Sequence, residues 1–180
     1  MTGSPAEPSP ALRLRRGRMS DIDTLVALEQ AVFTTDVVSR RSFRRFLAAA
    51  SATLMVAEEN GQLVGYALTL YPSHSTRARL YSIAVAPQAS GRGLGSLLLA
   101  AAEDEARRRG RRAMRLEVHE RNRRAIARYK KCGYLLFGKH RDYYDDHGDA
   151  LRFEKTLAAE PEDGPPVQND GDRLRHANRV

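Results

Sequence analysis

The sequence has little cysteine and no long apolar run. Its one cysteine, Cys132, excludes an internal disulfide and a metal site built from several cysteines. No segment approaches the roughly 18 to 20 uninterrupted apolar residues of a membrane-spanning helix. The first ten residues also have neither the basic nor the apolar region of a secretory signal. We therefore expect a cytoplasmic protein that does not enter a membrane.

Acidic residues are outnumbered by basic ones. The 180 residues include 30 Lys and Arg against 22 Asp and Glu, which gives a formal net charge of +8 at pH 7. This excess favours an anionic partner, and nucleic acid, a polyphosphate cofactor and an acidic protein all fit it. The length suits one domain with its own core.

Both ends of the chain are poor in apolar residues. Residues 1–10 are rich in Pro, Ser and Ala, and residues 158–180 are polar and rich in Pro and Gly. Neither end can bury enough apolar surface to fold alone. The sequence therefore predicts two disordered tails, 1–10 and 158–180, around one folded domain at 11–157.

Within this domain, strand patterns and helix patterns follow one another. The expected strands cover 11–18, 52–59, 62–71, 77–87, 113–120, 134–140 and 150–157, and the expected helices cover 21–33, 40–50, 94–109 and 122–131. Asn60-Gly61 between two strand patterns is a strong hairpin signal. The order predicts an α/β fold with a mixed central sheet of about seven strands, an antiparallel meander at its N-terminal side, and flanking helices.

Three glycines stand where a strand meets a helix, in the stretch 90–96, SGRGLGS. Glycine lets another molecule approach the main chain, and a helix start is a ready anion site. A nucleotide-binding P-loop would need Lys after its last glycine, where this chain has Ser96. A dinucleotide fingerprint would need G-x-G-x-x-G in a repeated parallel unit. Both designs fail, and a glycine-rich turn without a ligand is the remaining alternative.

The segments VAPQASGRGLGSLLL (85–99) and LEVHERNRRAIARYKKCGY (116–134) resemble the GCN5-related N-acetyltransferases (GNAT). Members of this family hold acetyl-CoA on a Q/R-x-x-G-x-G/A loop that opens a helix, and they use no metal. The resemblance implies that acetyl-CoA is the co-substrate and that its pyrophosphate contacts main-chain N–H groups of the loop. The loop residues so implied are Ser90, Gly91, Arg92, Gly93, Leu94, Gly95 and Ser96.

Two further features concern this cofactor. The resemblance places the thioester along the main chain of the preceding strand, at Ile83, Ala84 and Val85. Ser90 stands where the family has Gln or Arg, so we expect Arg92 to supply the charge, and we expect Gly93 and Gly95 to be bare so that the cofactor can approach.

Glu117 is a candidate general base. Acetyl transfer to an amine requires a neutral amine and an acid for the departing thiolate. Glu117 projects from the middle of a strand pattern between Leu116 and Val118, an unusual place for a carboxylate. In related enzymes that act on protein N-termini, the acid of the LEV motif is the proposed base. The alternative is a Glu paired with an Arg on a solvated face.

Asn122 and Tyr129 share one face of the expected helix at 122–131, because they are seven residues apart. A phenolic hydroxyl can protonate a thiolate, and an Asn amide can bind the pantetheine arm or cap a helix. The resemblance makes Tyr129 the general acid and Asn122 a cofactor contact. The alternatives are a core aromatic and a plain helix cap.

The loop RDYYDDHGDA (141–150) gives the best indication of the acceptor. It is similar to a segment of protein N-terminal acetyltransferases, including the bacterial type that modifies a ribosomal-protein alanine. By this resemblance Tyr143 and Tyr144 hold the first residues of a peptide, and Phe33 lines the acceptor groove. The acidic residues of the loop, Asp145, Asp146 and Asp149, could attract a cationic amine or could form a solvated turn.

The sequence thus predicts an N-acetyltransferase that transfers acetyl to a primary amine by direct attack in a ternary complex. The N-terminal α-amine of a protein or peptide, with a ribosomal protein as one candidate, is preferred over a small-molecule amine. The Arg-rich segment 105–131 leaves a non-catalytic RNA- or ribosome-associated module as the third hypothesis, although no nucleic-acid motif supports it. We expect a monomer or weak dimer, no metal at the scattered His119, His140 and His147, and Cys132 as a small core residue.

Overall fold

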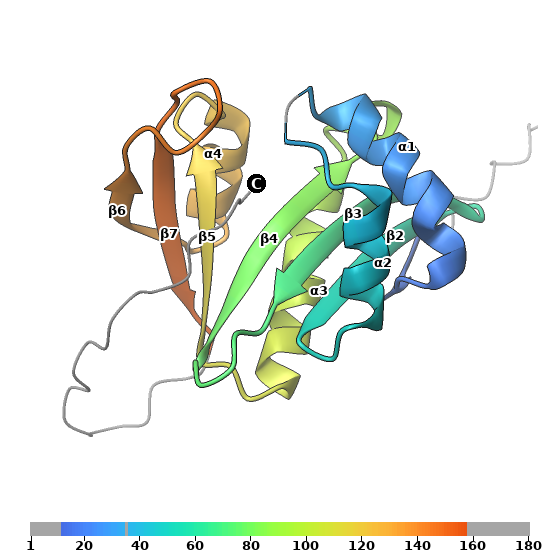
Figure 1. Ribbon diagram of the computed structural model, residues 1–180, viewed down its shortest axis with the longest axis horizontal. Helices are drawn as coiled ribbons and strands as arrows, with labels where there is room; N and C mark the ends of the chain where they lie inside the picture. Colours follow the sequence, from blue (N-terminus) through green and yellow to red (C-terminus); the bar gives the residue numbers. More distant parts are fainter. Residues whose placement is uncertain (1–11, 35, 158–180) are drawn as a thin grey trace, which may run out of the picture.

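A twisted seven-stranded sheet with helices on both faces makes up the described part of the molecule (Figure 1). The computed structural model describes residues 12–34 and 36–157, so the predicted tails lie outside the described residues. The strands are β1 (Leu12–Arg16), β2 (Ala52–Glu59), β3 (Gln62–Leu70), β4 (Arg77–Val85), β5 (Ala113–His119), β6 (Leu135–His140) and β7 (Ala150–Thr156). The helices are α1 (Ile22–Val32), α2 (Arg40–Ala48), α3 (Leu94–Arg108) and α4 (Arg123–Lys131), with short 3₁₀ turns at Met19–Asp21 and Pro87–Ala89.

The strand order is β1-β2-β3-β4-β5-β7-β6. The first four strands form the predicted antiparallel meander, and the pairing of β4 with β5 is parallel. Asn60 and Gly61 join β2 to β3 with φ angles of 50° and 81°, which is the left-handed geometry that an Asn-Gly hairpin turn requires. The predicted mixed α/β fold is therefore confirmed.

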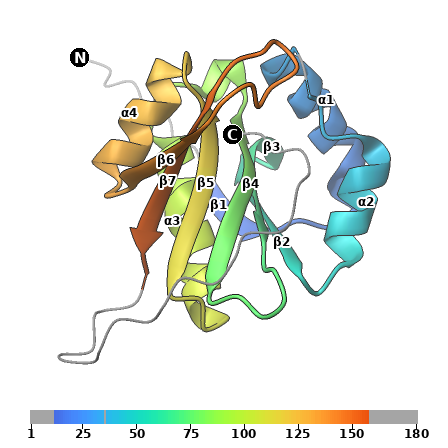
Figure 2. The same ribbon diagram turned by 60° about the vertical axis from the view of Figure 1, so that its left-hand side comes forward.

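The pairing of β4 with β5 is short. Between described residues it covers Arg77–Arg79 on β4 and Ala113–Arg115 on β5, although β4 continues to Val85 and β5 to His119. Beyond Arg79 the two strands separate into a V, which Figure 1 shows, and Figure 2 shows the same sheet after a turn of 60°. One edge of the β4 main chain at 83–85 therefore faces the open side of the V, where no strand of the described ranges pairs with it.

Helices α1 and α2 cover one face of the sheet, and α3 covers the other (Figure 1). Helix α3 buries Leu98, Ala102 and Ala106, which recur every four residues and so form one helical face. Full burial of one leucine side chain, such as that of Leu98, stabilises the fold by about 1.5–3 kcal/mol. Cys132 is half-buried against this core, as expected for a small core residue.

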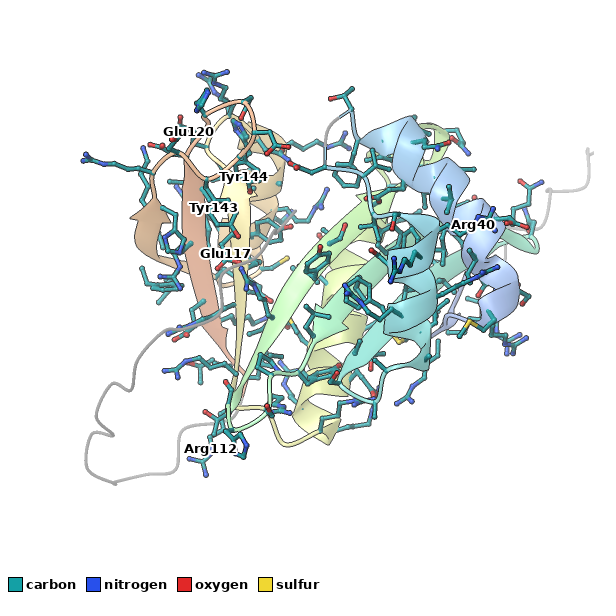
Figure 3. All side chains as sticks on the ribbon, viewed as in Figure 1. Arg40, Arg112, Glu117, Glu120, Tyr143 and Tyr144 are labelled. Atoms are coloured by element: carbon teal, nitrogen blue, oxygen red, sulfur yellow. The ribbon has the colours of Figure 1, made fainter. Side chains whose placement is uncertain are left out.

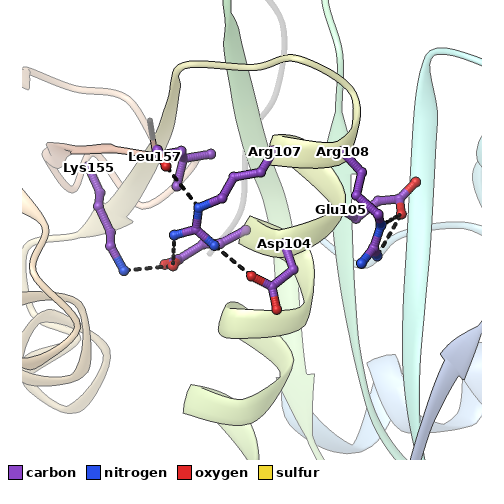
Figure 4. A network of polar contacts seen from close by, with 7 residues as sticks. Asp104, Glu105, Arg107, Arg108, Lys155 and Leu157 are labelled. Carbon is purple, nitrogen blue, oxygen red and sulfur yellow. Dashed lines mark hydrogen bonds and ion pairs between the residues drawn. The ribbon is translucent and has the colours of Figure 1, made fainter. Parts of the chain in front are cut away.

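The C-terminal turn of α3 is rich in ion pairs (Figure 4). Arg107 donates to the Leu157 carbonyl at 2.8 Å and pairs with Asp104 at 2.6 Å, and Arg108 pairs with Glu105 at 2.9 Å. Lys155 at the end of β7 donates to Glu103 at 2.6 Å. These contacts join the end of β7 to α3. They also give Arg107 and Arg108 carboxylate partners within the protein.

Candidate active site

The glycine loop forms the entrance to α3. Gly91 and Gly93 have φ angles of 85° and 80°, and a Cβ on either would meet no atom within 4 Å. Gly93 is the N-cap, and the N–H groups of Leu94 and Gly95 donate no hydrogen bond to any described residue. The loop therefore presents free N–H donors and the positive end of the helix dipole in one open place.

A cavity of about 270 Å³ lies over this helix start. Six of the seven predicted loop residues line it, namely Ser90, Gly91, Gly93, Leu94, Gly95 and Ser96. Its other walls are Val85, Ala89, Arg124, Ala127, Arg128 and Lys131. A cavity with free N–H donors and cationic side chains is suited to an anion such as a diphosphate.

Arg92 does not line this cavity. Its Nη1 donates to the Glu59 carboxylate of the β2–β3 hairpin at 2.9 Å, and its Nη2 contacts the other oxygen of the same group. The charge of Arg92 is therefore already compensated within the protein. The expectation that Arg92 supplies the charge missing at Ser90 stays a prediction, and it requires this contact with Glu59 to be given up.

Helix α4 supplies basic side chains to the cavity instead. Arg124, Arg128 and Lys131 line it, and none of them forms an ion pair with a described residue. The ideal Cβ position on Gly95 lies only 2.6 Å from the guanidinium carbon of Arg128. A side chain on Gly95 would therefore collide with an arginine of the same chain, while the approach of the cofactor to Gly95 stays a prediction.

A second cavity, of about 320 Å³, lies beside the first and extends along the open edge of β4. The predicted residues that line it are Phe33, Ile83, Ala84, Val85, Ser90, Asn122 and Tyr129. The two cavities share Val85, Ser90, Arg124 and Arg128. Together they connect the glycine loop to Tyr129, so the structure brings the predicted cofactor residues and the predicted acid together.

Tyr129 is completely buried and lines this second cavity. Its hydroxyl has no hydrogen-bond partner among the described residues. Burial raises the pKa of Tyr129 well above its ordinary value of 10, so the phenol stays protonated at neutral pH. Asn122 caps α4, because its Oδ1 accepts from the Ala125 N–H at 3.1 Å, and it also lines the cavity.

Glu117 on β5 is buried, with 4% of its surface exposed. Arg79 of β4 lies 3.0 Å from its Oε2, and Arg152 of β7 lies 3.7 Å from its Oε1. The carboxylate therefore does not belong to a solvated face. Sequence reasoning missed both arginines, because they come from strands that pair with β5 only in the folded sheet.

Tyr143 and Tyr144 lie beside Glu117 (Figure 3). Arg79 donates to the Tyr143 hydroxyl at 3.3 Å, and burial raises the pKa of Tyr143 to about 12. Burial, together with nearby Tyr143, Glu117 and Asp36, raises the pKa of Tyr144 well above its ordinary value.

The acidic residues of the β6–β7 loop are mostly engaged within the protein. Asp146 pairs with His119 at 3.1 Å, and Asp149 pairs with Lys139 at 2.6 Å. These contacts favour an ordered acidic turn over a free cation site. No group of three or more His, Cys, Asp or Glu residues in the described ranges is arranged to hold a metal ion, and no helix in these ranges is long and apolar enough to cross a membrane.

Comparison with known proteins gives the family of this site. Residues 22–134, well over half of the chain, match the model described as the Acetyltransferase (GNAT) family. The chain belongs to this family. The matched range includes β4, the glycine loop, Glu117 and Tyr129. The protein is thus a GNAT N-acetyltransferase.

The GNAT enzyme has relatives with two kinds of named acceptor. It is 30% identical over 145 residues to a Bacillus subtilis (strain 168) protein named "Putative ribosomal protein bS18-alanine N-acetyltransferase", a match that covers 80% of this chain and 95% of that protein. It is 36% identical over 88 residues to the streptothricin acetyltransferase of Streptomyces lavendulae, covering 49% of this chain and 47% of that protein.

The solved ribosomal-protein-S18-alanine N-acetyltransferase of Escherichia coli has the same fold as this GNAT enzyme. The two structures share a TM-score of 0.76 at 25% sequence identity. The match covers 86% of this chain and 99% of that chain.

Proposed function

We propose that this GNAT enzyme transfers the acetyl group of acetyl-CoA to the N-terminal α-amine of a protein or peptide. The family uses acetyl-CoA as its co-substrate. A relative that covers most of the chain is named for a ribosomal-protein alanine, and this supports an α-amine acceptor. The observation that carries the proposal is that both candidate groups, Glu117 and Tyr129, are buried, with two tyrosines of the β6–β7 loop near Glu117.

The residues present fit acetyl-CoA. The N–H groups of Leu94 and Gly95 and the guanidinium groups of Arg124 and Arg128 would hold its diphosphate in the first cavity. The second cavity would receive the pantetheine arm along β4 at 83–85, with Asn122 as a polar contact. The thioester then comes to the end of the cavity at which Tyr129 lies.

Acetyl-CoA supplies an activated carbonyl, and the side chains of the protein move the protons. Glu117 takes a proton from the acceptor ammonium, directly or through a water. The amine nitrogen forms a bond to the carbonyl carbon, and the carbon–sulfur bond breaks. Tyr129 gives its proton to the departing thiolate, and the proton lost by the new amide nitrogen restores the phenol.

A small-molecule amine is the second candidate acceptor, because one relative is named a streptothricin acetyltransferase. This chain matches that relative over 88 residues. That match covers less than half of either protein. The peptide assignment has the longer match and the support of Tyr143 and Tyr144 beside Glu117. We therefore rank the peptide acceptor first.

The test compares acceptors at saturating acetyl-CoA. The acceptors are a panel of short peptides with free N-termini, the same peptides with blocked N-termini, and spermidine as a small amine. The proposal predicts CoA release with free-ended peptides and little with the other two. CoA release with spermidine alone would move the assignment to small amines, and failure to bind acetyl-CoA in calorimetry would contradict the cofactor assignment.

A further inference from the structure

One face of the sheet near Glu117 has more arginines than carboxylates. The register of β4, β5 and β7 places Arg79 beside Arg115, and Arg152 opposite Glu117, on a single face. Arg77 and Glu154 belong to the same face, so four arginines share two glutamates. Arg77 and Arg115 both pair with Glu154, and Arg79 and Arg152 both pair with Glu117. This face therefore has an excess of positive charge beside the candidate base.

The two arginines at Glu117 keep unused hydrogen-bond donors. Arg79 uses Nε and Nη2, which contact Glu117 and Tyr143, and its Nη1 donates to no described residue. Arg152 donates no hydrogen bond within the described ranges, and its Nε is buried without a partner. Its contact with Glu117, at 3.7 Å, is too long for a hydrogen bond. A guanidinium has five N–H donors, so a second anion can be accommodated here.

These unused donors lie close to the place where the acceptor amine is expected, beside Glu117. Arg79 stands at the last paired position before β4 and β5 separate, and Glu117 lies two residues beyond that point on β5. Arg79 and Arg152 keep about a quarter and a fifth of their side-chain surface exposed, at 25% and 19%. An amine that approaches Glu117 therefore also comes close to both guanidinium groups.

We propose that Arg79 and Arg152 form an anion subsite that favours acceptors with a carboxylate on the residue that bears the amine, namely N-termini that begin with Asp or Glu. This inference rests on the proposed function. The side-chain carboxylate of a first-residue Asp or Glu is only a few bonds from its α-amine, so it comes to the guanidinium groups beside Glu117 while the amine contacts Glu117. A carboxylate can accept two parallel hydrogen bonds from a planar guanidinium. It would thus bind the N–H donors that the protein leaves unused.

The experiment uses matched peptides that differ only in residue 1, as Asp against Asn and Glu against Gln. The measured quantity is the ratio of kcat/KM between the acidic and the neutral peptide of each pair, with the acetylated atom located by mass spectrometry. One charge-assisted hydrogen bond predicts a ratio of about tenfold or more. The ratio should fall toward 1 in Arg152→Gln, whatever the loss in absolute rate.

Arg112→Gln is the matched control, because this exposed arginine lies just before β5, at the closed end of the V and away from Glu117 (Figure 3). It removes the same charge and should leave the ratio unchanged. A ratio of 1 or less in the unmodified enzyme would overturn the subsite, and so would an equal fall of the ratio in both variants.

The failure of the proposed function is distinguishable from the failure of this inference. Transfer to neutral peptides but not to acidic ones would contradict only the subsite. Absence of transfer to every peptide would contradict the α-amine assignment itself. Transfer to free aspartate or glutamate alone would show that an α-carboxylate is recognised, and it would overturn the preference for an acidic first residue in a peptide.

Discussion

The guanidinium carbon of Arg128 lies 2.6 Å from the point at which a Cβ on Gly95 would stand. This contact joins α4 to the first turn of α3 and brings a positive charge to the free N–H groups of the glycine loop. The loop lacks a basic or amide side chain at Ser90, and Arg92 is engaged by Glu59. Arg128 is therefore the side chain best placed to supply charge to a bound diphosphate.

We predict that Arg128→Gln weakens acetyl-CoA binding by about tenfold or more, because it removes charge-assisted hydrogen bonds to the cofactor. Calorimetry with acetyl-CoA measures the Kd directly, and Arg112→Gln is the control for loss of one charge. Gly95→Ala should also weaken binding, since the new Cβ displaces the Arg128 side chain. The two changes should be non-additive when combined, because they act on the same contact. Independent, additive effects would contradict this account.

Tyr129→Phe should lower kcat about 10²-fold or more with the fold unchanged, because the thiolate loses its proton donor. The side chain is buried without a hydrogen-bond partner in the described residues, so removal of the hydroxyl costs little stability. Tyr71→Phe is the matched control, because Tyr71 is a buried tyrosine just beyond β3, under the Arg109 guanidinium. Turnover of Tyr129→Phe equal to that of the control would remove Tyr129 from catalysis.

The pH dependence offers a second measure of Tyr129. Its active form is the protonated phenol, and burial raises its pKa above the ordinary value of 10. The enzyme should therefore lose no activity from this group as the pH rises to 10, and the loss should begin at higher pH. An alkaline decline centred well below 10 that disappears in Tyr129→Phe would contradict this prediction.

Glu117→Gln should lower kcat/KM by about 10²- to 10⁴-fold, the usual contribution of a positioned general base. Glu120→Gln is the control, since Glu120 lies just beyond the end of β5 (Figure 3), and its carboxylate pairs with Lys139 at 3.0 Å. The control should change the rate little. If rising pH restores the rate of Glu117→Gln, the substrate amine is the group that must be deprotonated, which supports the role of a base; a small effect at all pH values would contradict it.

Asp21 should contribute to stability in a pH-dependent way. Arg15 donates to both of its carboxylate oxygens, at 2.8 and 2.9 Å, and holds the pKa of Asp21 below its usual value. Such a pair is fully stabilising above the unfolded pKa of about 3.9 and is lost as the pH falls through the lower folded value. Asp21→Asn should lower the free energy of unfolding by about 1 kcal/mol at pH 7 and by less near pH 3.

Urea denaturation at the two pH values measures this difference, with Asp23→Asn as the control. Asp23 is 80% exposed in its ion pair with Arg40, so its replacement should cost little at either pH. A cost for Asp21→Asn that is equal at both pH values would contradict the assigned ion pair.

Local sequence signals predicted parts of the structure that depend on neighbouring residues. The Asn60-Gly61 turn, and the Asn122 cap that was one of two alternatives, each follow from the residue itself and its immediate context. The alternation along β5 also predicted correctly that Glu117 points away from the side on which Leu116 packs.

Contacts between distant elements could not be predicted in this way. Arg128 reaches Gly95 because α4 packs beside the start of α3, and Arg92 reaches Glu59 because the β2–β3 hairpin lies next to the glycine loop. Arg152 reaches Glu117 only through the pairing of β5 with β7. Each of these side chains is long and charged, so its partner is decided by tertiary structure rather than by local preference.

The most direct test of the central claim uses one peptide that carries a free N-terminus and an internal lysine, incubated with the enzyme and acetyl-CoA. Mass spectrometry with fragmentation then locates the acetyl group. The account predicts one acetyl group on the α-amine, none on the lysine, and no product when the N-terminus is blocked. Acetylation of the lysine in the blocked peptide, or an unmodified peptide while acetyl-CoA is bound, would contradict it.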